Sequence, residues 1–254
     1  MKIFQIIIIF LFAVFYQITA QVNIEKYNNI QNRFGYTGNI SFYLSAKTGN
    51  TDIQQFGIDG RLNYSAKTFY TFVIAQGEYG WKKGEEFSNN ALLHLRYIHN
   101  VSELINPEAF AQINYNKKRK LLFRSLFGGG IRITLIKKSE SNFVFGSSYM
   151  YEHENLDIPL SAAHPQNTNN HRWNNYLSYS NSFSKNARIS IVIYAQPKFS
   201  DFNDTRILSE NHLGVILTEK FSLSINFSLR YDSKPPDNIK NLDTNTKVGL
   251  TIKL

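Results

Sequence analysis

The 254-residue sequence contains no cysteine and only six prolines. The absence of cysteine excludes a disulfide scaffold and any thiolate metal or redox site. Charge is also scarce, because Asp, Glu, Lys and Arg make up 19% of the residues, whereas globular proteins usually carry about 25%. With 43% hydrophobic and 15% aromatic residues, this composition excludes an intrinsically disordered chain.

After its first twenty residues the sequence has no apolar run near the roughly 20 residues that a membrane-spanning helix needs. Lys2 precedes an apolar run from Ile3 to Tyr16, and a small residue, Ala20, follows. This order predicts a secretory signal peptide over residues 1–20, with a retained amino-terminal anchor as the alternative. We assign residues 21–37 to a periplasmic segment. The formal charge of +9 then favours lipid phosphate as a partner, and we expect no nucleic-acid binding.

Alternation of apolar and polar residues recurs along the rest of the chain. Between Phe221 and Tyr231 every odd-numbered residue is apolar and every even-numbered residue is polar, which is the pattern of a strand with two different faces. Similar patterns predict about twelve strands, several of them ten residues or longer. The alternation is least regular at Phe69–Ile74 and Arg172–Phe183.

Strand length separates two classes of all-β protein. Soluble strands average about five or six residues, whereas strands that cross a membrane need roughly 9 to 11. We therefore predict an antiparallel up-and-down transmembrane β-barrel of about 12 strands over residues 38–254, with a soluble periplasmic β-protein as the alternative. Its apolar face would contact lipid and its polar face the lumen. Aromatic residues near strand ends fit the two interfacial girdles: Tyr43, Tyr64, Tyr79, Trp81, Tyr97, Tyr115, Tyr151, Phe199 and Tyr231.

The connections between the predicted strands provide a second test, because outer-membrane barrels alternate short periplasmic turns with longer external loops. The even-numbered connections are all short. Among the odd-numbered ones, Lys82–Asn90, Asn155–Asn170 and Asp232–Leu242 are long. This pattern predicts a location in the outer membrane. The last strand, from Thr244, is expected to close the barrel against the first.

Three motifs carry a family resemblance: Gly49-Asn50-Thr51-Asp52, then Phe127-Gly128-Gly129-Gly130-Ile131 before Tyr149-Met150-Tyr151-Glu152, and Leu229-Arg230-Tyr231-Asp232-Ser233-Lys234-Pro235-Pro236. Together they resemble the family of salt-induced outer-membrane proteins, over most of residues 38–254. The resemblance implies an outer-membrane barrel linked to osmotic or salt stress, with no assigned reaction.

The family-motif residues are interpreted as structural. Gly and Asn tolerate positive φ, and two successive prolines end a strand because neither donates to a ladder. This interpretation covers Gly49, Asn50, Thr51, Asp52, Tyr231, Asp232, Pro235 and Pro236.

The fragment Tyr151-Glu152-His153-Glu154-Asn155 is the candidate for an enzymatic site, because it contains a histidine before a predicted long loop. Outer-membrane lipid hydrolases need a serine within reach of such a histidine, and Asn155 stands at that position. The other histidines show no metal-ligand spacing, and the triple glycine lacks the lysine of a nucleotide loop. We expect no catalytic residue, no metal and no cofactor.

Basic residues recur on the predicted lumen side: Arg61, Arg96, Arg124, Arg132, Arg188 and Arg230. Two interpretations stay open. Ion pairs with acidic residues on the same side would give a cross-linked interior, whereas rings of unpaired arginines would select anions in a narrow diffusion channel. The acidic residues predicted on that side are Asp59, Glu78, Glu108, Glu152 and Glu210. The expected partners are outer-membrane lipid, lipopolysaccharide and the outer-membrane insertion machinery.

Overall fold

The computed structural model describes residues 34–49, 52–219 and 221–252. They form one antiparallel sheet of twelve strands that neighbour one another in chain order, which confirms the predicted fold class. The strands are β1 Gly35–Lys47, β2 Ile53–Ser65, β3 Phe69–Lys82, β4 Glu85–His99, β5 Ile105–Asn116, β6 Leu121–Lys137, β7 Ser141–Leu156, β8 Asn167–Ser184, β9 Ala187–Lys198, β10 Asp201–Ile216, β11 Phe221–Asp232 and β12 Leu242–Ile252. The predicted signal peptide, residues 1–20, lies outside the described residues.

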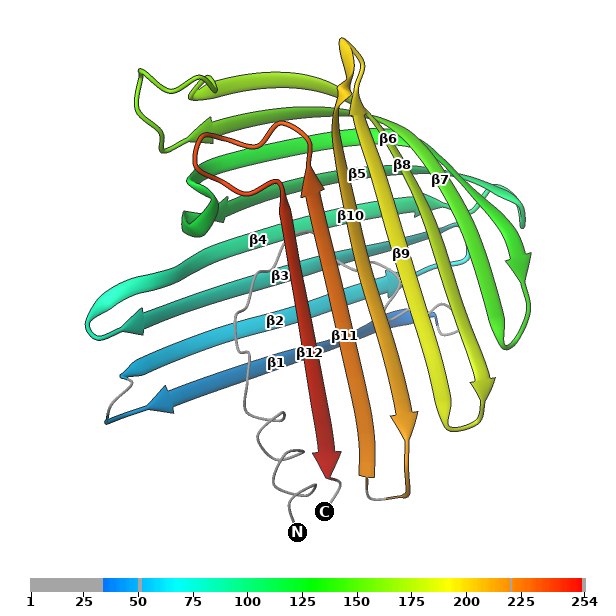
Figure 1. The fold of residues 1–254 in the computed structure, drawn as a ribbon. Helices are drawn as coiled ribbons and strands as arrows, with labels where there is room; N and C mark the ends of the chain where they lie inside the picture. The colour runs from blue at the N-terminus through cyan, green and yellow to red at the C-terminus, as the bar shows by residue number, and fades with distance from the viewer. Residues whose placement is uncertain (1–33, 50–51, 220, 253–254) are drawn as a thin grey trace.

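The sheet is strongly coiled. Strands β1–β4 run across the view in Figure 1 and β9–β12 run down it, so the two ends of the sheet wrap around a concave face. Among the described residues, β1 pairs with β2 alone and β12 pairs with β11 alone, so the expected pairing of the last strand with the first is not found there. No helix in this part of the chain combines the length and apolar character needed to cross a membrane.

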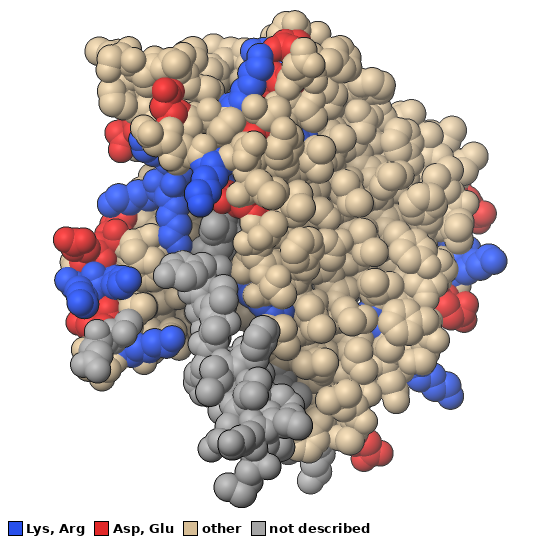
Figure 2. Space-filling model, in the orientation of Figure 1, with Lys and Arg blue, Asp and Glu red and all other residues tan. Residues whose placement is uncertain are grey.

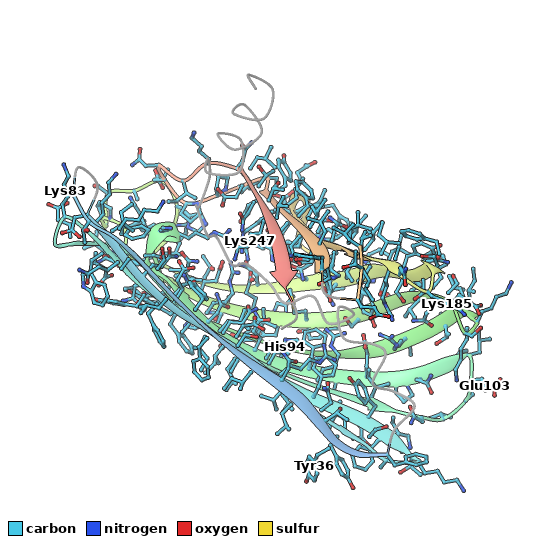
Figure 3. All side chains as sticks on the ribbon, turned by 90° about the horizontal axis from the view of Figure 1, so that it is seen from below. Tyr36, Lys83, His94, Glu103, Lys185 and Lys247 are labelled. Atoms are coloured by element: carbon cyan, nitrogen blue, oxygen red, sulfur yellow. The ribbon has the colours of Figure 1, made fainter. Side chains whose placement is uncertain are left out.

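The connections lie at two rims. The loop rim carries the long β7–β8 and β11–β12 connections, residues 157–166 and 233–241, and also a one-turn 3₁₀ helix, η2 (Lys117–Arg119), between β5 and β6. The opposite turn rim carries the β2–β3, β4–β5, β6–β7, β8–β9 and β10–β11 connections, which are all short. Figure 3 shows Lys83 at one end of the molecule and Glu103 and Lys185 at the other.

The prediction of a long loop at Lys82–Asn90 is wrong. Strands β3 and β4 are joined by Lys83 and Gly84 alone, with φ of 51° and 81°. Positive φ at both central residues is the mark of a tight type I′ hairpin turn, whose twist matches that of the strands. Glu85–Asn90 therefore continues as strand and pairs with β3.

Side chains alternate between the two faces, with polar groups inside. On β8, Arg172 and Asn174 are buried on the concave face, whereas Trp173 and Leu177 are exposed on the convex face. Exposed apolar side chains recur across the convex face: Leu93, Leu95, Ile113, Phe127, Ile131, Tyr149, Ile193 and Ile207. Figure 2 shows a broad surface with few charged side chains over β8–β11, with more charged groups at its borders.

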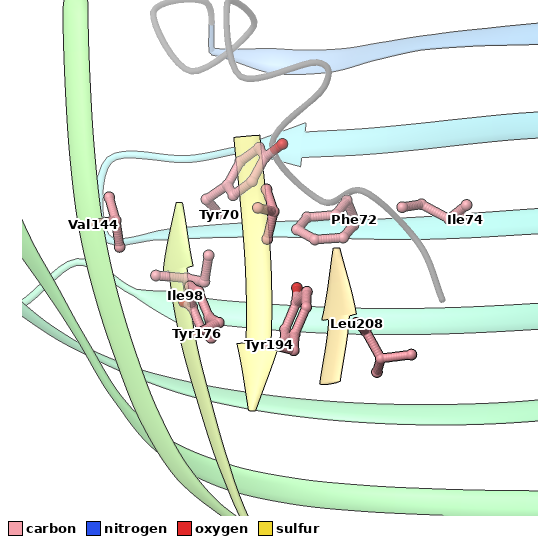
Figure 4. Packing of buried hydrophobic residues seen from close by; sticks show 9 residues of the cluster. Tyr70, Phe72, Ile74, Ile98, Val144, Tyr176, Tyr194 and Leu208 are labelled. Atoms are coloured by element: carbon pink, nitrogen blue, oxygen red, sulfur yellow. The ribbon is translucent and has the colours of Figure 1, made fainter. Parts of the chain in front are cut away.

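An apolar layer crosses the middle of the concave face. Its members come from β3, β4 and β7–β10: Tyr70, Phe72, Ile74, Ile98, Val144, Tyr176, Val192, Tyr194 and Leu208 (Figure 4). Tyr70, Phe72 and Ile74 point inward from β3, where Val73 lies on the other face. Both faces of β3 are therefore apolar, which explains the irregular alternation at Phe69–Ile74.

Candidate functional site: the concave face

An ionic cluster occupies the concave face near the loop rim. Five arginines and five carboxylates from β6, β7, β8, β10, β11, β12 and η2 form ion pairs there. Eight of these side chains are linked in one network, and Arg119 and Asp243 form a separate pair beside it. The members are Arg119, Arg124, Arg172, Arg206 and Arg230 with Glu152, Glu154, Asp204, Asp232 and Asp243. Positive and negative charges are equal in number, so the cluster is neutral as a whole.

Arg206 of β10 is the centre of this ionic cluster. Its three guanidinium nitrogens donate to Glu152 at 2.5 Å, to Glu154 at 2.9 Å and to Asp232 at 2.8 Å. These acceptors belong to β7 and β11, so one side chain joins strands that are not all neighbours in the sheet. Buried charges tolerate desolvation only when paired in this way.

Residues of the loop rim cover the cluster. Arg119 of η2 donates to Asp243 at 3.1 Å, and its burial lowers the pKa of its guanidinium to about 10. Leu121, Leu156 and Ile158 form a small apolar group at the same rim. The cavities among the cluster and this cover measure only about 30, 20 and 10 Å³.

The two long connections are joined to each other by Asp237 of the β11–β12 connection. Its carboxylate accepts from the backbone N–H of His164 at 2.8 Å and of Ala163 at 3.2 Å, both in the β7–β8 connection. These two hydrogen bonds lower the pKa of the Asp237 carboxyl below its ordinary value. We call this contact the rim latch.

A second polar group lies next to the apolar layer. Glu108 accepts from Arg96 at 3.0 Å and from the Tyr176 hydroxyl at 2.9 Å, and Arg132 donates to that hydroxyl at 3.2 Å. Arg61 is held separately, by Asn63 at 2.6 Å and Tyr70 at 2.8 Å. These contacts tie β2, β3, β4, β5, β6 and β8 together across the concave face.

The turn rim is different, because it contains a cavity of about 720 Å³. Four basic side chains (Arg132, Lys137, Lys138 and Arg188) and two acidic ones (Glu103 and Glu140) line this cavity, together with many serines and asparagines. We call it the vestibule. Its floor includes Tyr70 and Ile98 of the apolar layer.

All six arginines singled out from the sequence lie on the concave face. Arg61, Arg96, Arg124 and Arg132 are buried, Arg188 lines the vestibule, and Arg230 lies 4.0 Å from Asp232 in the ionic cluster. The structure does not gather them into one site, since they divide among the cluster, the middle and the turn rim. Figure 3 shows that His94 also points into the enclosed space.

Sequence reasoning missed several members of the ionic cluster. Arg119, Arg172, Arg206, Glu154, Asp204 and Asp243 were not among the predicted interior charges. The sequence contains one signal for them: side chains two residues apart in a strand share a face, so Glu154 is expected on the same face as Glu152. Asp232 was interpreted only as a turn residue, yet it accepts from Arg206 and from the backbone N–H of Lys234 at 3.1 Å.

The other described family-motif residues lie in connections, except Tyr231, which lies near the end of β11. Gly49 has a φ of +102°, which favours glycine. Asp52 accepts through its carbonyl from the backbone N–H of Lys83 at 2.9 Å. Pro235 and Pro236 border a small cavity over the cluster, and Tyr231 pairs with Leu242. Asn50 and Thr51 lie outside the described residues.

His153 does not belong to this interior. Its ring nitrogen is hydrogen-bonded to Asn169 at 2.9 Å, and its ring lies 6.5 Å from that of Phe123. Neighbouring residues Glu152 and Glu154 point to the other face and serve the ionic cluster. Among the described residues, no group of three or more His, Asp or Glu side chains is placed to hold a metal ion.

A family model described as "Protein of unknown function, DUF481" matches residues 40–254. The chain belongs to this family. The match confirms the resemblance to a family without an assigned activity, and it covers β2–β12 and most of β1.

Solved structures and curated proteins give further comparisons. The NanC porin in a rhombohedral crystal form is 11% identical with a TM-score of 0.47, covering 85% of this chain and 99% of its own. The KdgM porin in complex with disordered oligogalacturonate is 10% identical with a TM-score of 0.41, covering 86% and 99%. The search of curated proteins finds no match.

Proposed function

We propose that this chain is a non-enzymatic outer-membrane β-barrel protein whose interior is closed at the loop rim by the ionic cluster. The observation that carries the proposal is the reversal of polarity across the sheet. Charged and amide side chains such as Arg96, Glu152 and Asn174 are buried on the concave face, while large apolar side chains are exposed on the convex face. Lipid is the surrounding in which such a surface is stable.

Aromatic side chains on the convex face support this membrane placement. Near the turn rim the rings of Tyr36, Tyr64, Phe69 and Tyr97 follow one another with centroid separations of 4.7, 5.7 and 5.4 Å. Near the loop rim a second series comprises Phe127, Tyr151, His171, Tyr149 and Phe199. Two such bands match the interfacial girdles of outer-membrane barrels. Tyr43 departs from the predicted girdle, because its hydroxyl donates inward to Glu78 at 2.6 Å.

The two interpretations of the interior arginines, a cross-linked interior and an anion channel, differ in whether the arginines are paired with carboxylates. Four of the five arginines in the ionic cluster lie 3.1 Å or less from a carboxylate, so the loop-rim half is cross-linked. An open channel for small anionic solutes would need this cluster to separate. We therefore favour a barrel whose interior is blocked at the loop rim. The basic vestibule is the observation that supports passage of anions as a second candidate function.

Two further parts of the proposal rest on the sequence. The signal peptide at residues 1–20 would deliver the chain to the periplasm for insertion by the outer-membrane insertion machinery. A role in envelope integrity under osmotic or salt stress follows from the family resemblance. Lipopolysaccharide is the expected partner at the loop rim, where Lys82, Lys83, Lys117 and Lys118 provide positive charge.

The test is heat modifiability of the protein from the membrane fraction of expressing cells. A closed barrel resists detergent at room temperature, so the unboiled sample should migrate faster than the boiled one. Recovery in the soluble fraction, with identical migration before and after boiling, would overturn the membrane assignment. The same preparation then enters planar bilayers, where we expect no stable conductance steps.

A further inference from the structure

The vestibule contrasts in charge with the ionic cluster at the other rim. The cluster pairs its arginines with an equal number of carboxylates, whereas four basic side chains face only two acidic ones in the vestibule. Within the described chain neither Lys137 nor Lys138 forms an ion pair. The lining of the vestibule therefore has two more basic than acidic side chains, and Lys137 and Lys138 carry the charge that has no carboxylate partner among the described residues.

Arg132 gives this charge a fixed position in the wall of the vestibule. It is 5% exposed, and it donates to the Tyr176 hydroxyl, which itself donates to Glu108. The Tyr176 ring in turn packs against Gly146, where the absence of a side chain makes room for it. A planar guanidinium held by a buried network suits the recognition of oxyanions.

The neutral lining adds hydrogen-bond donors around the basic groups. Asn106 uses its side-chain oxygen to accept from the backbone N–H of Val101 at 3.0 Å and of Ser102 at 3.4 Å, which leaves its amide N–H groups for another acceptor. Asn142, Ser180 and Ser182 line the same space. The cavity volume of about 720 Å³ falls within the range of small-molecule sites, roughly 300 to 1,000 Å³.

We propose that the vestibule binds small multivalent oxyanions, such as solutes with several carboxylate or phosphate groups, from the turn rim. This inference rests on the proposed function, because the barrel topology places the turn rim in the periplasm. Arg132 and Arg188 would contact the anion inside the cavity, and Lys137 and Lys138 would attract it at the mouth. The apolar layer beneath would stop the anion short of the ionic cluster.

The experiment is titration calorimetry of the folded, detergent-solubilised protein with citrate, inorganic phosphate and, as a neutral probe, sorbitol. We expect both anions to bind, more weakly as salt is added, and sorbitol not to bind. The double variant Lys137→Gln/Lys138→Gln should weaken citrate binding about tenfold, since two charges near the ligand are lost. Arg188→Gln should weaken it by a similar factor.

The matched control is Lys198→Gln/Lys240→Gln, which removes the same charge from the loop rim, outside the lining of the vestibule, and should leave citrate binding unchanged. Equal weakening by both double variants would overturn the vestibule as the site, as would equal binding of sorbitol and citrate. Absence of anion binding by protein that still shows the heat-dependent band shift would refute this inference alone. Absence of the shift itself would refute the proposed barrel.

Discussion

At the scale of single residues, close packing on the concave face depends on glycines that lie under aromatic rings. A side chain built at Gly146 of β7 would meet the ring of Tyr176 on β8, and that ring cannot turn aside, because its hydroxyl is bonded to Glu108 and Arg132. Pairs of this kind support register in β-sheets. Glycine at such a position therefore has a packing role beyond backbone freedom.

We expect Gly146→Ala to lower the free energy of unfolding by about 1–3 kcal/mol, the usual range for overpacking. Urea unfolding of the refolded protein in detergent measures the change. Gly129→Ala on β6 is the control, since its new methyl group would meet only the Glu108 carbonyl oxygen at 3.5 Å, an ordinary contact. Equal effects of the two substitutions would contradict the role given to the Tyr176 ring.

At the scale of elements, strand number and order could be predicted from the sequence because alternation is a local property. The errors arose where local pattern and tertiary position disagree. Lys83 adopts positive φ in a turn where asparagine or aspartate is usual, so the β3–β4 hairpin was mistaken for a loop. Tyr70 and Phe72 are apolar and face inward, so apolar and polar residues do not alternate regularly along β3. The ionic cluster was largely hidden, since Arg206 and Glu152 are brought together only by the coiling of the sheet.

The rim latch at Asp237 is a contact between elements with a defined pH dependence. A carboxyl whose folded pKa is lowered stabilises the folded contact above its ordinary pKa, and this contribution is lost as the pH falls through the lowered value. The ordinary value is 3.8, so the latch should be intact at neutral pH and should weaken only below about pH 4.

We expect Asp237→Asn to expose the β7–β8 connection at neutral pH, because one of the two acceptor oxygens becomes a donor facing a backbone N–H. Hydrogen exchange at the amides of Ala163 and His164 should become roughly tenfold faster. Asp157→Asn serves as the control in the same connection, since its side chain is exposed. Unchanged protection in Asp237→Asn would show that other contacts hold the two connections together.

At the scale of the whole molecule, the two rims of the concave face differ in how open they are. The turn rim contains a large basic cavity, the middle is closed by an apolar layer, and the loop rim is closed by a neutral ionic cluster under two joined connections. In the proposed barrel, solutes would therefore enter the vestibule more easily than they would cross the molecule. Arg206 is the side chain on which closure at the loop rim most depends, because it contacts three carboxylates on two strands.

Arg206→Ala should open the half of the interior next to the loop rim. Removing one partner of a buried ion pair costs about 3–5 kcal/mol, because Glu152, Glu154 and Asp232 then repel one another and draw in water. We expect the variant to give conductance steps in planar bilayers where the unaltered protein gives none, and its remaining carboxylates to favour cations. Arg188→Ala is the control, since it removes the same side chain from the already wide vestibule. Heat modifiability verifies that each variant is folded before it is measured. Conductance by the unaltered protein equal to that of Arg206→Ala would show that the cluster does not close the interior, and a diffusion channel would then be the better description of this family member.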